Sequence, residues 1–191
     1  MIEKKSAKRR PAPIGLTREK IVSTAIEMIE EDGLASLSAR KLGARLGCEA
    51  MSLYNHVSNM DDLFDAIVDT LLATVIAGPS GTMKERAQAY LALAHRCPNA
   101  FLLVATRKWR TSNAIATAAI FIDDLRARGL SDGEALQRAR ALGAYLNGAG
   151  LALAAWRKDD AAEGTEGAAA VHADLDTGLA QLLAGLEKPA R

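Results

Sequence analysis

Aromatic residues and cysteine are scarce in this sequence, and each shortage excludes a class of protein. Phe, Trp and Tyr make up 4% of the 191 residues although 49% are hydrophobic, so the core must be built from Ala, Leu, Ile and Val. Alanine has the best helix propensity and strand-favouring residues are few, so the composition favours an all-α bundle. Two cysteines, Cys48 and Cys97, are too few for a disulfide framework and lack metal-site spacing. They indicate a reducing compartment, and we interpret them as structural thiols, with redox sensing as the alternative.

Long apolar runs and a strong net charge are also missing. No run approaches the roughly 20 residues that span a bilayer, and the N-terminus has no apolar signal core, so we expect a cytoplasmic protein without a membrane partner. The net charge is only +1, which argues against indiscriminate coating of nucleic acid. Residues 1–58 nevertheless carry ten Lys and Arg against seven Asp and Glu. A mildly basic head on a mildly acidic body fits DNA contact at one end of the chain.

Residues 37–57 are the most informative stretch. Leu42 and Leu46 lie four apart and can share one face of a short helix. Gly47 follows where that helix must stop and turn, since glycine accepts positive φ without a steric penalty. The next helix, expected within residues 49–56, has few residues able to pack inward and leaves polar and aromatic side chains facing outward. This pattern is typical of a helix-turn-helix, in which one helix supports and the next enters the major groove.

The flanking segments extend the same unit. Residues 17–31 have apolar positions at helical spacing, with Thr17 as the expected N-cap and Gly33 as the C-terminal stop. Ser58 and Asn59 precede two acids and a second amphipathic helix, which suits a capped helix start. The unit is therefore expected to contain three helices and the base of a fourth.

Residues 17–75 resemble the N-terminal domain of TetR-family transcriptional regulators, with the tetracycline-repressor branch nearest. The resemblance is carried by Arg40-Lys41-Leu42, Leu46-Gly47 and Leu53-Tyr54-x-His56-Val57, with further matches at Ala25, Gly33, Leu37, Ser38, Asn59, Leu63 and Ala66. Three positions depart from the family pattern. Gly43 stands for the usual alanine, Cys48 for the usual valine, and Met60 for a lysine that commonly meets a phosphate.

The resemblance implies which side chains meet DNA. Base edges are assigned to Glu49, Ala50, Met51 and Asn55, and phosphates to Ser52, Tyr54 and His56, with Arg40 and Lys41 adding charge beside the DNA backbone. A carboxylate can accept from a cytosine amino group, and apolar side chains can contact a thymine methyl. The ring of Tyr54 can also pack on its own helix. Two such readers related by a two-fold axis require a palindromic operator on double-stranded DNA.

The chain divides into four predicted parts. These are a disordered basic arm (1–16), the helix-turn-helix domain (17–58), a connecting helix (59–77) and a helical effector-binding and dimerisation domain (82–191). The arm either contacts DNA or serves solubility. Within the last domain, helices are expected at 82–96, 99–106, 113–128, 132–158 and 169–186, with a loop at 159–167.

The C-terminal part resembles the effector domain of the same family more weakly, through Pro98, Asn113, Tyr145, Gly148 and the run from Gly129 to Ser131. Family members pair their last two helices across a dimer, and small residues at steps of three and four independently permit close helix approach. The candidate interface is Ala141, Ala144, Gly148, Leu151, Ala155, Leu175, Leu179, Leu182 and Leu183. An ordinary intrachain core is the alternative.

The family also implies a ligand cavity among the body helices. The candidate lining is Leu71, Tyr90, His95, Phe101, Trp109, Phe121, Asn147 and Trp156, which would suit a small apolar or aromatic effector. Core packing is the alternative for each of them. Arg107, Lys108 and Arg110 flank Trp109, and we interpret them as a solvated helix end, with an anionic effector as the alternative. No metal site, cofactor or catalytic residue is predicted.

We therefore predict a homodimeric repressor that a small-molecule effector releases from its operator. The alternative is a DNA-binding regulator without such an effector, either controlled by a protein partner or constitutive. An enzyme built on His95 and Cys97 is disfavoured, because residues two apart on a helix point to different faces and no orienting acid is evident.

Overall fold

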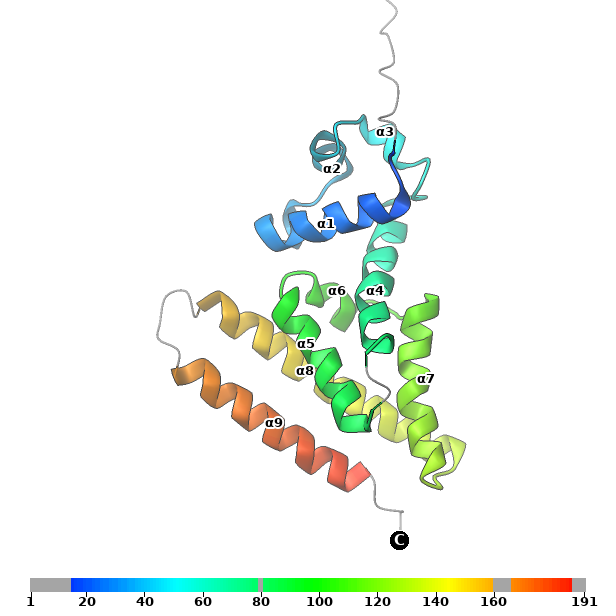
Figure 1. The fold of residues 1–191 in the computed structure, drawn as a ribbon, viewed down its shortest axis with the longest axis vertical. Helices are drawn as coiled ribbons and strands as arrows, with labels where there is room; N and C mark the ends of the chain where they lie inside the picture. Colours follow the sequence, from blue (N-terminus) through cyan, green and yellow to red (C-terminus); the bar gives the residue numbers. More distant parts are fainter. Residues whose placement is uncertain (1–14, 79–80, 160–165, 187–191) are drawn as a thin grey trace, which may run out of the picture. The chain divides into compact units, whose positions relative to one another are not determined.

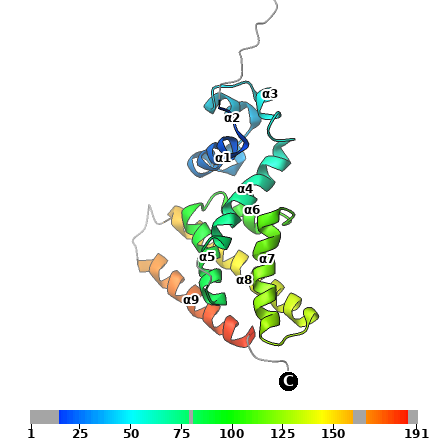
Figure 2. The same cartoon turned by 45° about the vertical axis from the view of Figure 1, so that its right-hand side comes forward.

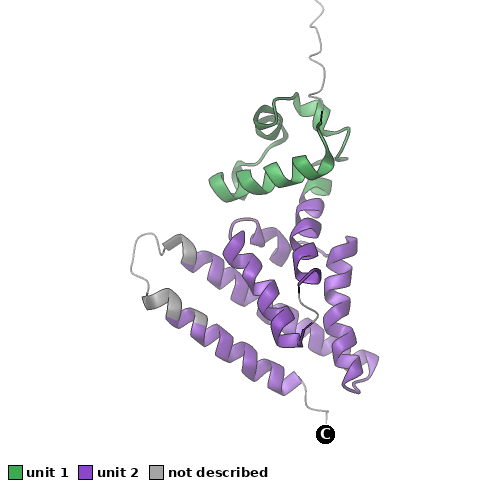
Figure 3. Cartoon of the chain, in the orientation of Figure 1, with its two compact units in different colours: residues 1–63 green, residues 64–191 purple. Residues whose placement is uncertain are grey.

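The computed structural model describes residues 15–78, 81–159 and 166–186, and every regular element within them is a helix (Figure 1). The all-α prediction is confirmed. The predicted basic arm, except for its last two residues, and most of the predicted loop at 159–167 lie outside the described residues. In the described part, no helix is long and apolar enough to cross a membrane. The chain forms two compact units, residues 1–63 and 64–191 (Figure 3).

The first unit contains α1 (Arg18–Asp32), a short 3₁₀ turn (Leu34–Ser36), α2 (Ala39–Arg45), α3 (Ala50–Leu53) and the start of α4 (Met60–Ile76). Thr17 caps α1 as predicted, because its hydroxyl accepts a hydrogen bond from the Lys20 N–H at 3.2 Å. Gly33, at φ 82°, ends the helix. The core of the first unit is aliphatic and includes Ile21, Ala25, Ile29, Leu42 and Leu53.

The turn between α2 and α3 brings their backbones into direct contact. The Cys48 N–H donates to the Gly43 carbonyl at 2.8 Å. A Cβ atom placed on Gly43 would lie 2.9 Å from the Cys48 carbonyl oxygen and 3.1 Å from the Ala50 nitrogen. Gly47 adopts the positive φ that the sequence predicts, at 70°. The glycine at position 43 therefore permits an approach of α3 that a side chain would obstruct. Helix α3 is shorter than the helix predicted within residues 49–56, because the chain forms turns instead of helix from Tyr54 onward.

The second unit is arranged around the 28-residue helix α8 (Asp132–Asp159), which contacts the other helices of the bundle (Figures 1 and 2). These are α5 (Met83–Arg96), α6 (Phe101–Thr106), α7 (Ser112–Ala127) and α9 (Glu166–Leu186). Thr82 and Glu85 form a reciprocal capping box at the start of α5. The helix ends lie within a few residues of those predicted, and α9 begins at Glu166, inside the expected loop.

Glycines let α8 pack closely on two neighbours. A Cβ on Gly150 would lie 2.3 Å from the ring of Phe101, which is fully buried. On the α9 side, the Tyr145 hydroxyl donates to the Leu175 carbonyl at 2.7 Å, and a Cβ on Gly178 would lie 2.5 Å from that hydroxyl oxygen. At both contacts a glycine leaves space for an aromatic side chain of the neighbouring helix, so glycine stands where a larger residue would normally fill the core.

The compact units divide at Leu63, inside α4, whereas the sequence predicts that the second domain begins only after the connecting helix ends at residue 77. Polar contacts explain the difference, because the part of α4 that follows Leu63 is bound to the segment after α6 and to the first turn of α7. The Arg107 guanidinium pairs with Asp65 at 2.8 Å, and the Asn113 N–H donates to the Asp69 carboxylate at 2.8 Å. The connecting helix thus begins in the first unit and continues as an integral element of the second.

Candidate DNA interface and effector cavity

The chain after Gly47 presents side chains that take little part in the fold. Glu49 is the N-cap residue of α3, yet its carboxylate makes no capping hydrogen bond. Met51 is 70% exposed and Tyr54 is 38% exposed. Large apolar side chains left in solvent beside a packed core mark a surface built for contact.

The predicted DNA-contacting residues differ in exposure but belong to one stretch of the first unit. Arg40, Lys41, Glu49, Met51, Tyr54 and Asn55 are exposed, whereas Ala50, Ser52 and His56 are half-buried. Arg40 and Lys41 form no ion pair with any other described residue, so their charges are available to phosphates. Arg45 differs, because its guanidinium binds Glu31 at 2.7 Å.

A charged clamp that the sequence does not predict, formed by Arg18 and Asp62, holds the end of residues 49–56, the reading segment. The guanidinium of Arg18 binds Asp62 at 2.6 Å and donates to the His56 carbonyl at 2.8 Å. The same carboxylate accepts from the Ser58 N–H at 2.7 Å. The hydrogen bonds from Arg18 and Ser58 lower the pKa of Asp62 to about 2. The acidic residues at the start of α4 are visible in the sequence. The partner of Asp62 lies 44 positions earlier, however, and no rule of sequence spacing predicts a pair so far apart.

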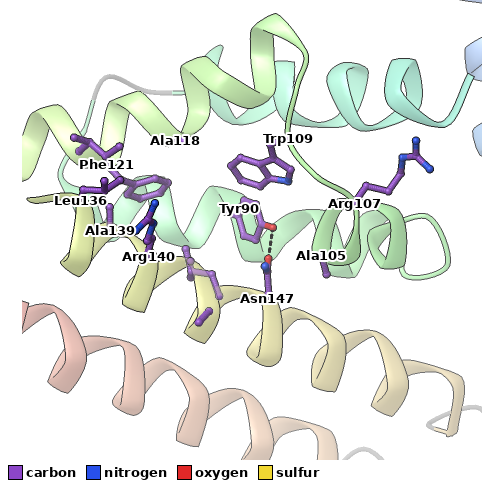
Figure 4. A pocket seen from close by; sticks show the side chains of 14 residues that line it. Tyr90, Ala105, Arg107, Trp109, Ala118, Phe121, Leu136, Ala139, Arg140 and Asn147 are labelled. Atoms are coloured by element: carbon purple, nitrogen blue, oxygen red, sulfur yellow. Dashed lines mark hydrogen bonds between the residues drawn. The ribbon is translucent and has the colours of Figure 1, made fainter. Parts of the chain in front are cut away.

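The second unit contains a cavity of about 520 Å³ between α5, α7 and α8 (Figure 4). Its lining is Tyr90, Ala105, Arg107, Trp109, Ala118, Phe121, Ile122, Leu136, Ala139, Arg140, Gly143, Ala144, Leu146 and Asn147. Small and apolar residues predominate, as in sites for organic ligands.

Four of the eight predicted lining residues belong to this cavity, namely Tyr90, Trp109, Phe121 and Asn147. The other four are placed elsewhere. Leu71 and Phe101 are buried in the core, the latter against Gly150, and Trp156 is 44% exposed. His95 borders a smaller hollow of about 220 Å³ between α5, α8 and α9. Sequence periodicity identifies inward-facing residues but does not separate a cavity wall from a packed core.

Hydrogen bonds and ring contacts fix the aromatic wall of the cavity. The Tyr90 hydroxyl donates to Oδ1 of Asn147 at 2.6 Å, as the dashed line in Figure 4 shows. The rings of Tyr90 and Trp109 lie 6.0 Å apart between centroids at an angle of 45°. The indole N–H of Trp109 donates to the Val104 carbonyl at 3.0 Å. Burial raises the pKa of Tyr90 far above its ordinary value, so its hydroxyl remains a donor.

The segment that carries Trp109 is tied to α4 at both of its ends. Before it, Arg107 binds Asp65 and its guanidinium lies 5.5 Å from the centre of the Phe64 ring. After it, the side-chain amide of Asn113 donates to the Asp69 carboxylate at 2.9 Å. The residues on either side of Trp109, which forms part of the cavity wall, are therefore bound to α4, the helix that follows the reading segment.

The candidate dimer residues fall into two groups. On α8, Ala141, Ala144, Gly148 and Ala155 are exposed and Leu151 is half-buried; on α9, Leu175 and Leu182 are half-buried, whereas Leu179 and Leu183 are buried within the chain. The four exposed residues of this α8 face have little cover in the described chain, although Ala144 also lines the cavity. The leucine face of α9 is shared with the chain's own core, as the alternative of an intrachain core predicts.

Neither metal binding nor thiol chemistry gains support from the described part of the chain. It holds no group of three or more His, Cys, Asp or Glu side chains placed to bind a metal ion. Cys48 and Cys97 are both half-buried. Burial raises the pKa of the Cys48 thiol, which favours its unreactive protonated form.

The short helix α3 exposes Met51, is flanked by the exposed residues Glu49 and Tyr54, and follows α2 across a glycine turn, which is the arrangement of a helix-turn-helix reader of DNA. The fold and this site define the class of helix-turn-helix DNA-binding proteins.

Comparison with known proteins names the family. Residues 21–67 match the model of the bacterial regulatory proteins of the tetR family. An HTH-type transcriptional regulator of Saccharopolyspora erythraea is 36% identical over 165 residues, which cover 82% of this chain and 69% of that protein. The chain belongs to the TetR family, whose members regulate transcription and are not enzymes, so the hypothesis of a catalytic His95 and Cys97 is not retained.

Two further relatives match to different extents. The class D tetracycline repressor of Escherichia coli is 41% identical over 58 residues, 30% of this chain and 27% of that protein. A variant of TetR from Acinetobacter baumannii AYE, solved in complex with minocycline, superposes with a TM-score of 0.75 at 26% identity, covering 92% of this chain and 100% of that one.

Proposed function

We propose that this regulator is a homodimeric repressor that a small apolar or aromatic effector releases from a palindromic operator. The observation that carries the proposal is the cavity of about 520 Å³ in the second unit. It is large enough for a drug-sized molecule, since pockets for such ligands measure ~300–1,000 Å³. The A. baumannii TetR variant crystallised with minocycline supports a small molecule as the effector.

Effector control requires only that the ligand bind the DNA-incompetent arrangement better than the competent one. A ligand against Trp109 would displace the segment between α6 and α7. Arg107 in that segment is bound to Asp65 of α4, and Asn113 at the start of α7 is bound to Asp69, so α4 would respond. Since α4 begins at Met60, directly after the reading segment, its movement would change the position of α3.

Dimerisation would use the exposed small-residue face of α8 with the half-buried leucines of α9. Small side chains allow two helices to approach closely, and an exposed apolar helix face is costly in a monomer. A two-fold axis would then place two α3 helices on related half-sites, which is why we propose a palindromic operator. Such a regulator acts on DNA in the cytoplasm.

At each half-site, Glu49, Ala50, Met51 and Asn55 would read base edges while Ser52, Tyr54, His56, Arg40 and Lys41 hold the backbone. The supporting observation is that Glu49 and Met51 contribute little to the fold, as an unused cap and a 70% exposed side chain. Side chains free of structural roles are available for direct readout.

The test is selection of duplex DNA from a random pool by the purified protein. The selection is repeated in the presence of metabolites extracted from cells. Enrichment of a palindrome whose binding is lost with extract supports a dimeric, effector-responsive reader. Enrichment of a palindrome that extract leaves bound favours the alternative, a regulator that is constitutive or controlled by a protein partner. Failure to enrich any sequence contradicts the assigned DNA contacts.

A further inference from the structure

The charge of the cavity lining points to a narrower class of ligand. We propose that the effector is a flat aromatic anion whose acid group binds the guanidinium of Arg140. This inference rests on the proposed effector role of the cavity and names the chemistry that the cavity would select.

The lining contains two cations and no carboxylate. Arg107 is already neutralised, because its guanidinium pairs with Asp65 at 2.8 Å. Arg140, on α8, makes no hydrogen bond or ion pair with any other described residue. A guanidinium offers a planar fork of donors that fits carboxylates, sulfonates and phosphates, and such charge-assisted hydrogen bonds are stronger than neutral ones. The local field therefore favours an anion at this end of the cavity.

The other polar groups of the lining reinforce the need for an acceptor. The Tyr90 hydroxyl is satisfied by Asn147, and the Trp109 indole N–H by the Val104 carbonyl. Among the described residues, the side-chain nitrogen of Asn147 has no partner, so it remains a second free donor. A ligand that enters meets donors from Arg140 and Asn147, which favours a ligand that carries hydrogen-bond acceptors.

The walls select a flat ring system. Trp109 and Tyr90 provide aromatic faces on one side, and in the view of Figure 4 Phe121 lies at the end of the cavity where Arg140 projects. On the α8 side of the cavity, Gly143 leaves open space, because an added Cβ would meet no atom within 4 Å. Aromatic side chains in the lining favour stacked or edge-on contacts with a ligand ring.

Two dyes with the same rings and different charge provide the test. The anion 8-anilinonaphthalene-1-sulfonate and the uncharged N-phenyl-1-naphthylamine are titrated by fluorescence into the full-length protein without DNA. Arg140→Gln should weaken binding of the anion by about tenfold or more and change binding of the neutral dye by less than about twofold. Equal losses for both dyes, or no loss for the anion, would overturn the proposal.

Two further variants separate the site from general effects. Arg110 is exposed, as Arg140 is, but lies outside the lining, so Arg110→Gln should leave both affinities unchanged. If it weakens the anion as much as Arg140→Gln does, overall charge explains the result and the proposal is wrong. Gly143→Leu should weaken both dyes by filling the cavity, and unchanged binding of both would show that the dyes bind elsewhere, against the proposal.

Release of the selected operator by the anion is measured separately by fluorescence anisotropy. If Arg140→Gln weakens binding of the anion and not of the neutral dye, but the anion does not release DNA, the proposed ligand class is supported and the proposed effector control fails. If the anion releases DNA equally from the wild-type protein and Arg140→Gln, the effector control stands and the role of Arg140 is overturned.

Discussion

Arg18 donates through both terminal nitrogens to the two carboxylate oxygens of Asp62, at 2.6 and 3.1 Å. The pair joins the first residue of α1 to the first turn of α4 and also holds the His56 carbonyl. The end of the reading segment is therefore fixed by a side chain that does not itself belong to it.

Replacing Arg18 by Gln should loosen this corner. We expect a loss of about 1 kcal/mol in the free energy of unfolding of the first unit, at the low end for charge-assisted hydrogen bonds because both groups are partly exposed. DNA affinity should fall as well, because the segment that carries Tyr54 and His56 becomes less ordered. Thermal unfolding and operator binding measure the two effects. Arg45→Gln is the control, since its ion pair with Glu31 lies on the surface and should contribute much less.

The same pair makes stability depend on pH in acid. The pKa of Asp62 is lowered from 3.8 to about 2 by the hydrogen bonds from Arg18 and Ser58, so the folded state favours the charged carboxylate. The stabilisation is fully present above pH 3.8 and is lost as the pH falls towards 2. The difference in melting temperature between the wild-type protein and Asp62→Asn should therefore shrink over that interval. A difference that stays constant there would argue against the clamp.

Base-reading and phosphate-binding residues should respond differently to truncation. Glu49→Ala should alter the preferred base at one position of each half-site, because a good base contact contributes about 1–3 kcal/mol of discrimination. Tyr54→Ala should weaken binding to all sequences alike. Competition binding against single-base operator variants distinguishes the two patterns. Equal changes of preference in both variants would contradict the assignment.

The salt dependence of operator binding should report the unpaired cations of α2. Arg40 and Lys41 form no ion pair with other described residues, so each is available to a phosphate. The double variant with alanine at both positions should reduce the slope of log K against log salt by about two for each subunit. Arg45→Ala provides a matched control, because its charge is already bound to Glu31 and the slope should barely change.

Two glycines of α8 should give opposite results on replacement by alanine. Gly143 has open space where a Cβ would go, so Gly143→Ala should stabilise the protein by up to about 1 kcal/mol through helix propensity. Gly150→Ala would place its Cβ 2.3 Å from the Phe101 ring and should cost about 1–3 kcal/mol, as overpacking does. The buried Phe101 cannot yield easily, because Tyr90 packs on it edge-on with centroids 5.6 Å apart. Melting temperatures of both variants provide the measurement.

The sequence predicts the helices well because their signals are local. Thr17 and Gly33 mark the ends of α1, and the Thr82–Glu85 pair begins α5, each within four residues of the backbone groups it satisfies. The compact reading unit is equally visible, since its motif lies within 21 consecutive positions. Such features depend on nearest neighbours along the chain and need no knowledge of the tertiary fold.

The cavity and the clamp are less predictable because they depend on contacts between distant residues. Phe101 and Trp109 are both aromatic residues of the second unit, yet Gly150 provides space for the first to be buried while the second faces an opening. Arg140 was missed for a similar reason, because an arginine on an amphipathic helix ordinarily indicates a solvated face. Only its place in the lining distinguishes it.

The contact between Gly43 and the start of α3 has an evolutionary consequence. The frame of the reader is set by backbone atoms, through the 2.8 Å hydrogen bond from Cys48 and the absence of a Cβ at position 43. Substitutions at Glu49 and Met51 leave this frame untouched and, like most surface changes, should alter the free energy of unfolding by no more than about 0.5 kcal/mol. A duplicated gene can therefore acquire a new operator through single point mutations, each of which leaves a folded protein for selection to act on.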